Sequence, residues 1–307
     1  MTRATWMYFQ EGLTQQQTAD RLGLSRIKVA RLISAARKKG IVRITIDSSL
    51  APYLELEQKL REVYGLVEAI VTTEAPEGEA LHRILAQAGA NLLSRRMHPG
   101  ITVGIGHGRT LSWIPTFFHP PACPGCTFIT LVGMTGGDVR RDIPLRSYSL
   151  CQDLADEAGG RAEFILAPAA VSNGEIKESL LRDTAIGQSL KLARHCQLAV
   201  IGVGPAADQG LFFKAGYMNQ RDLKEIEASC AVGEALGSFF NERGQEIPTG
   251  FSSRLIAISL AEFREIPTTV IVAGGARKIP AIRGALVGRL AKILVTDAAT
   301  ARGLVAT

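Results

Sequence analysis

The chain has 307 residues, of which 46% are hydrophobic and 21% are charged. This length is about twice that of a typical domain of about 150 residues, and the composition is that of a folded protein, so we expect two globular domains. The 31 glycines and 13 prolines follow no period, and five cysteines are too few for a disulfide framework. A disordered chain, a collagen and a disulfide miniprotein are therefore excluded.

The net charge of +6 is concentrated at the start of the chain. Residues 1–50 contain nine basic and three acidic side chains, whereas basic and acidic residues balance in the rest of the sequence. A basic head on a neutral body predicts a module that binds a polyanion, joined to a body with another task.

The sequence predicts a cytoplasmic protein without a membrane segment. Its first residues do not have the charged start and sustained apolar stretch of a secretory leader. The longest uncharged run, residues 110–137, is interrupted by four prolines, and a membrane helix needs roughly 20 apolar residues in an unbroken run.

The head has the pattern of a helix-turn-helix domain. Residues 4–11 predict a short first helix, and Thr14 with Gln17 has the spacing of a capping box that begins a second helix. Gly23–Ser25 predicts a tight turn with Ser25 as the N-cap of a third helix over 26–39. Two helices joined by such a short turn are typical of DNA-binding domains.

The third helix is expected to be the recognition helix. We assign its apolar side to Ile27, Ala30, Leu32, Ile33, Ala35 and Ala36, and its cationic, exposed side to Arg26, Lys28, Arg31, Ser34 and Arg37. This pattern predicts a helix that enters the major groove of double-stranded DNA rather than an ordinary amphipathic helix. The side chains expected to contact phosphates are Thr14, Gln15, Ser25 and Lys38, and those expected at base edges are Arg26, Lys28 and Arg31.

A strand and a helix are expected to connect the head to the body. Residues 41–46 alternate as a strand does, and residues 47–52 form a polar break that ends in proline. A linker helix follows over 53–64, and its apolar stripe of Leu56, Leu60 and Val63 fits either packing within the body or a dimer contact. We therefore expect a helix-turn-helix domain over 1–50, a linker helix over 51–64 and an effector domain over 65–307.

The body alternates between strand and helix patterns. The predicted strands are short apolar runs at Val67–Thr72, Ile101–Ile105, Thr127–Val132, Ala162–Leu166, Leu198–Val203, Thr268–Val272 and Lys292–Thr296. The predicted helices between them include Glu79–Arg96, Ser149–Glu157, Leu180–Arg194, Arg221–Ser229 and Ile279–Leu290. This order predicts an α/β effector domain with a mostly parallel, open sheet, whose ligand lies beyond the carboxyl ends of the strands.

Glycine-rich segments follow four of these strands, at residues 103–110, 131–137, 201–204 and 272–278. Each one alone fits a tight turn. Together with the donors Arg109, Thr110 and Lys278, the four segments predict a site for a phosphorylated ligand, because glycine lets backbone N–H groups approach an anion. A dinucleotide fold does not fit, since the segment after Gly104 and Gly106 has Arg109 where the third glycine would stand, and no acid ends the next strand.

The remaining chemical signals are weaker. Cys123 and Cys126 have the spacing of a redox pair or half a zinc site, but reduced thiols in a proline-rich loop fit better, so neither a metal nor a cofactor is expected. Asp297 is expected to cap the last helix. The three histidines His82, His98 and His195 are interpreted as structural or surface residues.

These motifs together resemble the SorC-type transcriptional regulators of bacterial sugar metabolism. In the head, the resemblance rests on Gly12–Gln15, Ala19, Leu22–Arg26, Val29, Arg31, Leu32 and Gly40–Ile44. In the body, it rests on Gly104–Leu111, Gly202–Gly204, Ala231–Ala235, Ala273–Lys278, Ala281–Leu286 and Val295–Asp297. The chain departs from the usual family pattern at His107, where an aromatic residue is common, and at Glu234 and Asn241, where aspartate is common.

The resemblance implies an effector domain of the sugar-phosphate isomerase and deaminase type, assembled as a homo-oligomer, usually a tetramer. By this analogy the phosphate of a sugar or polyol effector lies at Gly106, His107, Gly108, Arg109, Thr110, Thr135 and Gly136, and the sugar hydroxyls face Glu234 and Lys278. The implied function is a DNA-binding regulator of a carbohydrate or polyol catabolic operon. The alternative is an isomerase-like or deaminase-like enzyme with an appended DNA-binding head, using Asp208, Glu234 and Lys278 as acid and base groups.

Overall fold

The computed structural model describes residues 1–42, 50–134, 147–206 and 211–306. The chain divides into two compact units, which we call the N-terminal unit (Met1–Ala51) and the α/β unit (Pro52–Thr307). No helix within these described ranges is long and apolar enough to cross a membrane.

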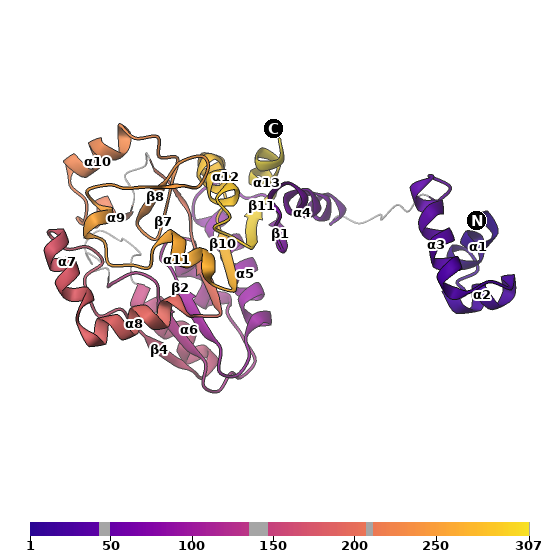
Figure 1. The fold of residues 1–307 in the computed structure, drawn as a ribbon, viewed down its shortest axis with the longest axis horizontal. Coiled ribbons are helices and arrows are strands. Elements are labelled where there is room, and N and C mark those ends of the chain that lie inside the picture. The colour runs from indigo at the N-terminus through magenta and orange to yellow at the C-terminus, as the bar shows by residue number, and fades with distance from the viewer. Residues whose placement is uncertain (43–49, 135–146, 207–210, 307) are drawn as a thin grey trace. The chain divides into compact units, whose positions relative to one another are not determined.

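The N-terminal unit contains three helices (Figure 1), namely α1 (Thr2–Phe9), α2 (Gln15–Leu22) and α3 (Arg26–Lys38). The predicted capping box is confirmed: the Thr14 hydroxyl accepts a hydrogen bond from the Gln17 N–H, and the Gln17 side chain accepts one from the Thr14 N–H. Gly23 has a positive φ of 63°, which glycine adopts without strain, and ends α2 three residues before α3 begins. The Ser25 hydroxyl caps α3, as expected.

The buried stripe of α3 differs in part from the predicted one. Val29, Ile33 and Ala36 are buried, and the first two pack with Ala19 of α2, whereas Ile27 is 67% exposed. The prediction was wrong at Ile27 because apolar character alone placed it on the inner side, while the helical spacing of the three buried residues places it on the opposite one. The predicted strand over 41–46 lies largely outside the described residues.

The α/β unit is built on a seven-stranded parallel sheet, as predicted. Its strands lie in the order β1-β11-β10-β5-β2-β3-β4, and every adjacent pair is parallel. In chain order they are β1 (Glu68–Thr72), β2 (Thr102–Ile105), β3 (Thr127–Thr130), β4 (Arg161–Glu163), β5 (Leu198–Ile201), β10 (Thr268–Val272) and β11 (Ile293–Asp297).

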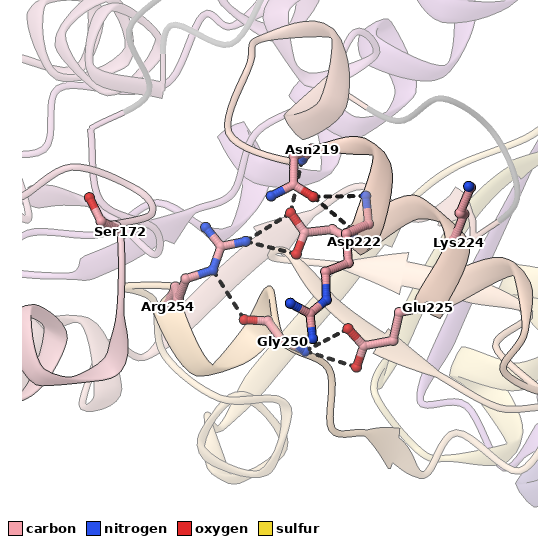
Figure 2. A pocket seen from close by; sticks show the side chains of 8 residues that line it. Ser172, Asn219, Asp222, Lys224, Glu225, Gly250 and Arg254 are labelled. Carbon is pink, nitrogen blue, oxygen red and sulfur yellow. Dashed lines mark hydrogen bonds and ion pairs between the residues drawn. The ribbon is translucent and has the colours of Figure 1, made fainter.

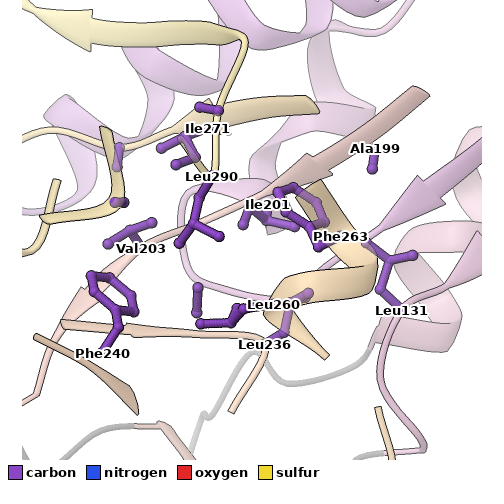
Figure 3. Packing of buried hydrophobic residues seen from close by; sticks show 14 of the residues in the cluster. Leu131, Ala199, Ile201, Val203, Leu236, Phe240, Leu260, Phe263, Ile271 and Leu290 are labelled. Carbon is purple, nitrogen blue, oxygen red and sulfur yellow. The ribbon is translucent and has the colours of Figure 1, made fainter. Parts of the chain in front are cut away.

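Both faces of this sheet are buried along its inner strands, which explains why these strands are mostly apolar, whereas the edge strand β4 contains the exposed Arg161 and Glu163. Along β10, Val270 and Val272 belong to one hydrophobic core, and Ile271 between them belongs to a second. Figure 3 shows part of the second core, where Ile201 lies beside Phe263 and Ile271 beside Leu290. Because strand side chains alternate between faces, apolar residues at every position predict helices or loops over both sides.

Helices and short 3₁₀ segments connect the strands (Figure 1). The helices are α4 (Ala51–Tyr64), α5 (Glu79–Arg96), α6 (Ser147–Ala158), α7 (Gly174–Leu181), α8 (Thr184–Arg194), α9 (Leu211–Lys214), α10 (Gln220–Glu227), α11 (Leu260–Glu265), α12 (Ile279–Val287) and α13 (Ala298–Val305). The 3₁₀ segments are η1 (Leu111–Phe117), η2 (Ser252–Arg254) and η3 (Ala276–Lys278). The predicted helix over 180–194 is in fact two helices, since the Asp183 carboxylate caps α8 by accepting from the N–H groups of Ala185 and Ile186.

Helix α4 packs within the α/β unit. Leu56 and Leu60 are buried there, and the Tyr64 hydroxyl donates to the Leu304 carbonyl at 2.7 Å. The Val71 N–H donates to the Glu57 carboxylate at 2.9 Å. Two residues of the predicted stripe therefore pack inside the body, whereas the third, Val63, is 55% exposed.

A second sheet was not predicted. It is antiparallel and contains the very short strands β6 (Gly204–Pro205), β7 (Gly233–Ala235), β8 (Ser238–Phe240) and β9 (Glu246–Ile247). Strands of two or three residues are too short to show an alternating pattern, and β6 to β9 therefore leave no periodic signal in the sequence. This sheet places Glu234 of β7 opposite Gly204, which follows the carboxyl end of β5.

Candidate functional site

The loop after β2 contributes the first group of residues to the candidate effector site. It contains Gly106, His107, Gly108, Arg109 and Thr110, of which Thr110 is buried and Arg109 is exposed. The Gly106 N–H donates to the Val200 carbonyl at 2.9 Å and so ties the loop to β5. Within the described residues, no acceptor is seen for the N–H groups of Gly108 and Arg109. Both groups therefore remain available to an anion.

His82 joins this loop, although the sequence analysis interpreted it as structural or surface. Its Nδ1 lies 3.0 Å from the Thr110 hydroxyl. Burial, then the positive charges of Lys278 and Arg109, lower the pKa of His82 to about 4, so the imidazole is neutral near pH 7. Lys278 and Arg109 come from different loops, and the charges of both act on the His82 imidazole. A signal for His82 did exist, because the start of α5 follows β1 and so belongs to the carboxyl edge of the sheet.

Glu234 and Lys278 are the second group of residues in the candidate effector site. Burial raises the pKa of Glu234 to about 7, and the effect is opposed by a hydrogen bond from the Gly237 N–H and by the charge of Lys278. Lys278 ends η3, beyond the carboxyl end of β10, and interacts electrostatically with both Glu234 and His82. The site therefore combines a carboxyl group that gains or loses a proton near neutral pH with an ammonium group.

His107 faces an aromatic neighbour. It is 8% exposed and its ring meets Phe212 of α9 edge-on, with 4.9 Å between the ring centroids. Burial lowers the pKa of His107 to about 4, which keeps the ring neutral. The imidazole thus occupies an apolar, aromatic environment, which agrees with the aromatic residue that the resemblance suggests for this position.

The glycines of the predicted loops have different tasks. A Cβ at Gly104 would lie 2.5 Å from the Leu131 side chain, and one at Gly274 would lie 2.3 Å from the Asp297 carboxylate. These two glycines therefore serve packing rather than ligand approach. Gly108 has a φ of 139° and open space around it, which suits a loop that receives a ligand. The predicted phosphate contacts Thr135 and Gly136, and the candidate acid Asp208, lie outside the described residues.

Comparisons with known proteins agree with this organisation. The Sugar-bind family model, which describes a sugar-binding domain, matches residues 49–306. The erythritol catabolism regulatory protein EryD of Brucella abortus is 32% identical over 99% of this chain and 95% of its own length. The deoxyribonucleoside regulator of Bacillus subtilis is 29% identical over 98% of this chain and 96% of its own.

The chain belongs to the SorC/DeoR-type family of sugar-binding transcriptional regulators. The relatives of this regulator named above are transcriptional regulators and not enzymes. The full-length sorbitol operon regulator SorC from Klebsiella pneumoniae has the same fold, with a TM-score of 0.76 over 98% of this chain and 96% of that one, at 24% identity. A DeoR family regulator from Listeria monocytogenes is 30% identical, with a TM-score of 0.74 over 82% of this chain and 99% of that one.

The predicted DNA-contacting residues of this SorC/DeoR-type regulator lie on α2, on α3 and at their caps. Arg26, Lys28, Arg31 and Lys38 are exposed, and Gln15 is partly buried at the start of α2. The hydroxyl groups of Thr14 and Ser25 each accept a helix N–H. Each of these hydroxyl groups therefore already caps a helix, and a DNA phosphate at this position would contact a hydroxyl that also accepts the helix N–H.

An open groove of about 730 Å³ lies elsewhere in the α/β unit of this regulator, between α10 and the loop at Gly250 (Figure 2). Several of its polar groups bind each other: Arg254 donates to both carboxylate oxygens of Asp222 at 2.8 Å, and the Gly250 N–H donates to the Glu225 carboxylate. We therefore interpret the groove as a structural joint. The sequence analysis did not predict it.

The structure also describes Asp297 and two of the cysteines singled out in the sequence. The Asp297 carboxylate accepts from the Thr300 N–H and caps α13, as expected. Cys123 and Cys126 are free and buried, and burial raises the pKa of both thiols. Among the described residues, no group of three His, Cys, Asp or Glu side chains is arranged to hold a metal ion.

The ionisation of Glu234 gives the regulator a testable pH dependence. Its pKa is about 7 in the folded chain and near 4.5 in a free carboxyl group, so its contribution to stability is complete below pH 4.5 and is lost as the pH rises through 7. We expect the Glu234→Gln variant to gain stability relative to wild type by about 3 kcal/mol between pH 4.5 and 7.5. Urea unfolding of both proteins across this range measures the difference, and a constant difference would contradict the assigned environment.

Proposed function

We propose that this protein controls a carbohydrate or polyol catabolic operon, and that its effector is a phosphorylated sugar or polyol. The observation that carries the proposal is the 3.0 Å contact between His82 and Thr110, beside loop N–H groups that have no acceptor among the described residues, at a place where the charges of Lys278 and Arg109 both lower the pKa of His82. Two cations and free N–H donors are a suitable environment for a phosphate dianion. Glu234 and Lys278 would contact the hydroxyl groups.

The names of relatives support this class of effector. One relative is named an erythritol catabolism regulatory protein and another a deoxyribonucleoside regulator, and both names fit a regulator whose effector derives from a polyol or a sugar. We propose that the chain forms a dimer or tetramer, and that the effector changes the spacing of two-fold related α3 helices. Half-sites on DNA lie about 34 Å apart or at multiples of this distance, so a shift between subunits would alter operator binding.

A thermal-shift screen of the full-length protein tests the effector. The panel contains erythritol 4-phosphate, ribose 5-phosphate, deoxyribose 5-phosphate and sorbitol 6-phosphate, each with its unphosphorylated parent. At 100 times its dissociation constant, a ligand stabilises the fold by about 2.7 kcal/mol. We expect stabilisation by a phosphate ester and not by its parent. Equal stabilisation by the parent would remove the phosphate from the proposal.

Alanine variants test which residues on and near α3 contact base edges and which contact phosphates. If Arg26, Lys28 or Arg31 contacts a base edge, its replacement should reduce discrimination at one operator position by about 1–3 kcal/mol. Replacement of Lys38, proposed as a phosphate contact, should weaken binding to all sequences equally and reduce the salt dependence. Fluorescence anisotropy with single-position operator variants at several salt concentrations separates the two. A uniform loss at Arg31 would reassign this residue to the phosphates.

A further inference from the structure

The exposed Ile27 side chain on α3 does not pack in the core of the N-terminal unit. Ile27 is 67% exposed, whereas the core of the N-terminal unit is formed by Ala19, Val29 and Ile33. It is not required as a helix cap either, since Ser25 caps α3. Single exposed apolar side chains are common on protein surfaces, so the position of Ile27 on the basic recognition helix, and not its exposure alone, carries the inference.

Its place on the helix is specific. Residues 27, 31, 34 and 38 are spaced by four, three and four positions, so Ile27, Arg31, Ser34 and Lys38 lie along one face of α3. All four are exposed. This face lies opposite the stripe of Val29, Ile33 and Ala36 that packs inside the unit. Ile27 thus lies on the outward face of α3, in the first turn of the helix.

The surroundings of Ile27 match one partner, the major groove of DNA. Arg26 and Lys28 lie on either side of it, and Arg31 lies one turn further along the same face. The first turn of a recognition helix is the part nearest the base edges. Isoleucine has no hydrogen-bonding group, and the apolar group in the major groove is the 5-methyl group of thymine.

We propose that Ile27 reads a thymine in the operator by contact with its 5-methyl group. This inference rests on the proposed function, in which α3 binds DNA, and adds a specificity-determining residue to it. It makes Ile27 a source of sequence preference that carries no charge, so its contribution should not depend on salt.

A substitution on each side of the contact tests the proposal. The probe is a duplex selected by the full-length protein from a random library, in which each thymine is replaced in turn by deoxyuridine, which removes only the methyl group. Loss of one buried methyl group should weaken wild-type binding by about fourfold at one thymine, or at its symmetry mate in each half-site. Ile27→Ala should weaken binding to the unmodified duplex and should respond no further to that replacement.

Two variants serve as controls. Ile27→Val keeps an apolar branch and should retain the response to deoxyuridine. Ile176→Ala makes the same change as Ile27→Ala at a position in α7 that is 42% exposed, and it should leave DNA binding unchanged. Because Ile27 is exposed, the melting temperature of Ile27→Ala should equal that of wild type, which excludes misfolding as a cause.

The outcomes are distinct. If the protein selects no duplex, the proposed DNA-reading function of α3 fails, and this inference fails with it. If a duplex is selected but no thymine replacement affects wild type, or if Ile27→Ala responds to deoxyuridine as wild type does, the inference is overturned while DNA binding stands. An altered oligomeric state of Ile27→Ala in the absence of DNA would instead assign Ile27 to a contact between protein chains.

Discussion

Arg254→Ala is expected to destabilise the α/β unit by about 3–5 kcal/mol, because it leaves the buried Asp222 carboxylate without its partner. The Arg254 side chain is 17% exposed and that of Asp222 is 7% exposed, and the guanidinium donates to both carboxylate oxygens at 2.8 Å. The same guanidinium donates to the carbonyl groups of Gly250 and Val171, so α10 and two loops are joined at this residue. Urea unfolding measures the loss.

Arg221→Ala provides the matched control for Arg254→Ala. Arg221 lines the same groove but is exposed, and its replacement should change the free energy of unfolding by less than about 0.5 kcal/mol. Adding Asp222→Asn to Arg254→Ala removes the isolated charge and should restore part of the stability. A loss below about 1 kcal/mol in Arg254→Ala would contradict the structural interpretation of the groove.

Lys278→Met is expected to weaken binding of the phosphorylated effector by about 10- to 150-fold, since a hydrogen bond to a charged group contributes about 1.5–3 kcal/mol. The variant removes the ammonium group that acts on both His82 and Glu234. The pKa of Glu234 should then rise further, because Lys278 lowers it in the wild type. Isothermal titration with the phosphate ester found in the thermal-shift screen measures the affinity.

The control for Lys278→Met is Lys224→Met, which removes an exposed cation from the groove beside α10. This variant should bind the effector as wild type does. Both variants should bind operator DNA in the absence of effector, because neither residue lies in the N-terminal unit. Unchanged effector affinity in Lys278→Met would contradict the proposed site.

Features with a local cause could be predicted from the sequence. The caps at Thr14, Ser25 and Asp297 depend on one side chain and an N–H group three residues away, so the sequence contains the whole interaction. The inner strands β2, β3, β5, β10 and β11 are mostly apolar because both faces of the sheet are buried there, and such runs are recognisable without knowledge of their neighbours.

Features with a distant cause could not be predicted. The antiparallel sheet that places Glu234 opposite Gly204 has strands too short for a periodic pattern. His82 contacts Thr110, which is 28 residues away in the sequence, and it also interacts electrostatically with Lys278, which follows a different strand, β10. The exposure of Ile27 depends on which stripe of α3 meets α2, and residue hydrophobicity alone does not state it.

We propose that a phosphate ester bound at Arg109 and Lys278 controls DNA binding. The most direct test of this claim is the affinity of the full-length protein for its selected duplex, measured by fluorescence anisotropy with and without saturating phosphate ester, and with the unphosphorylated parent. We predict a change of about tenfold or more with the ester and none with the parent, and for Lys278→Met a much smaller change at an ester concentration that just saturates the wild type. An equal response to ester and parent, or a full response in Lys278→Met, would contradict the claim.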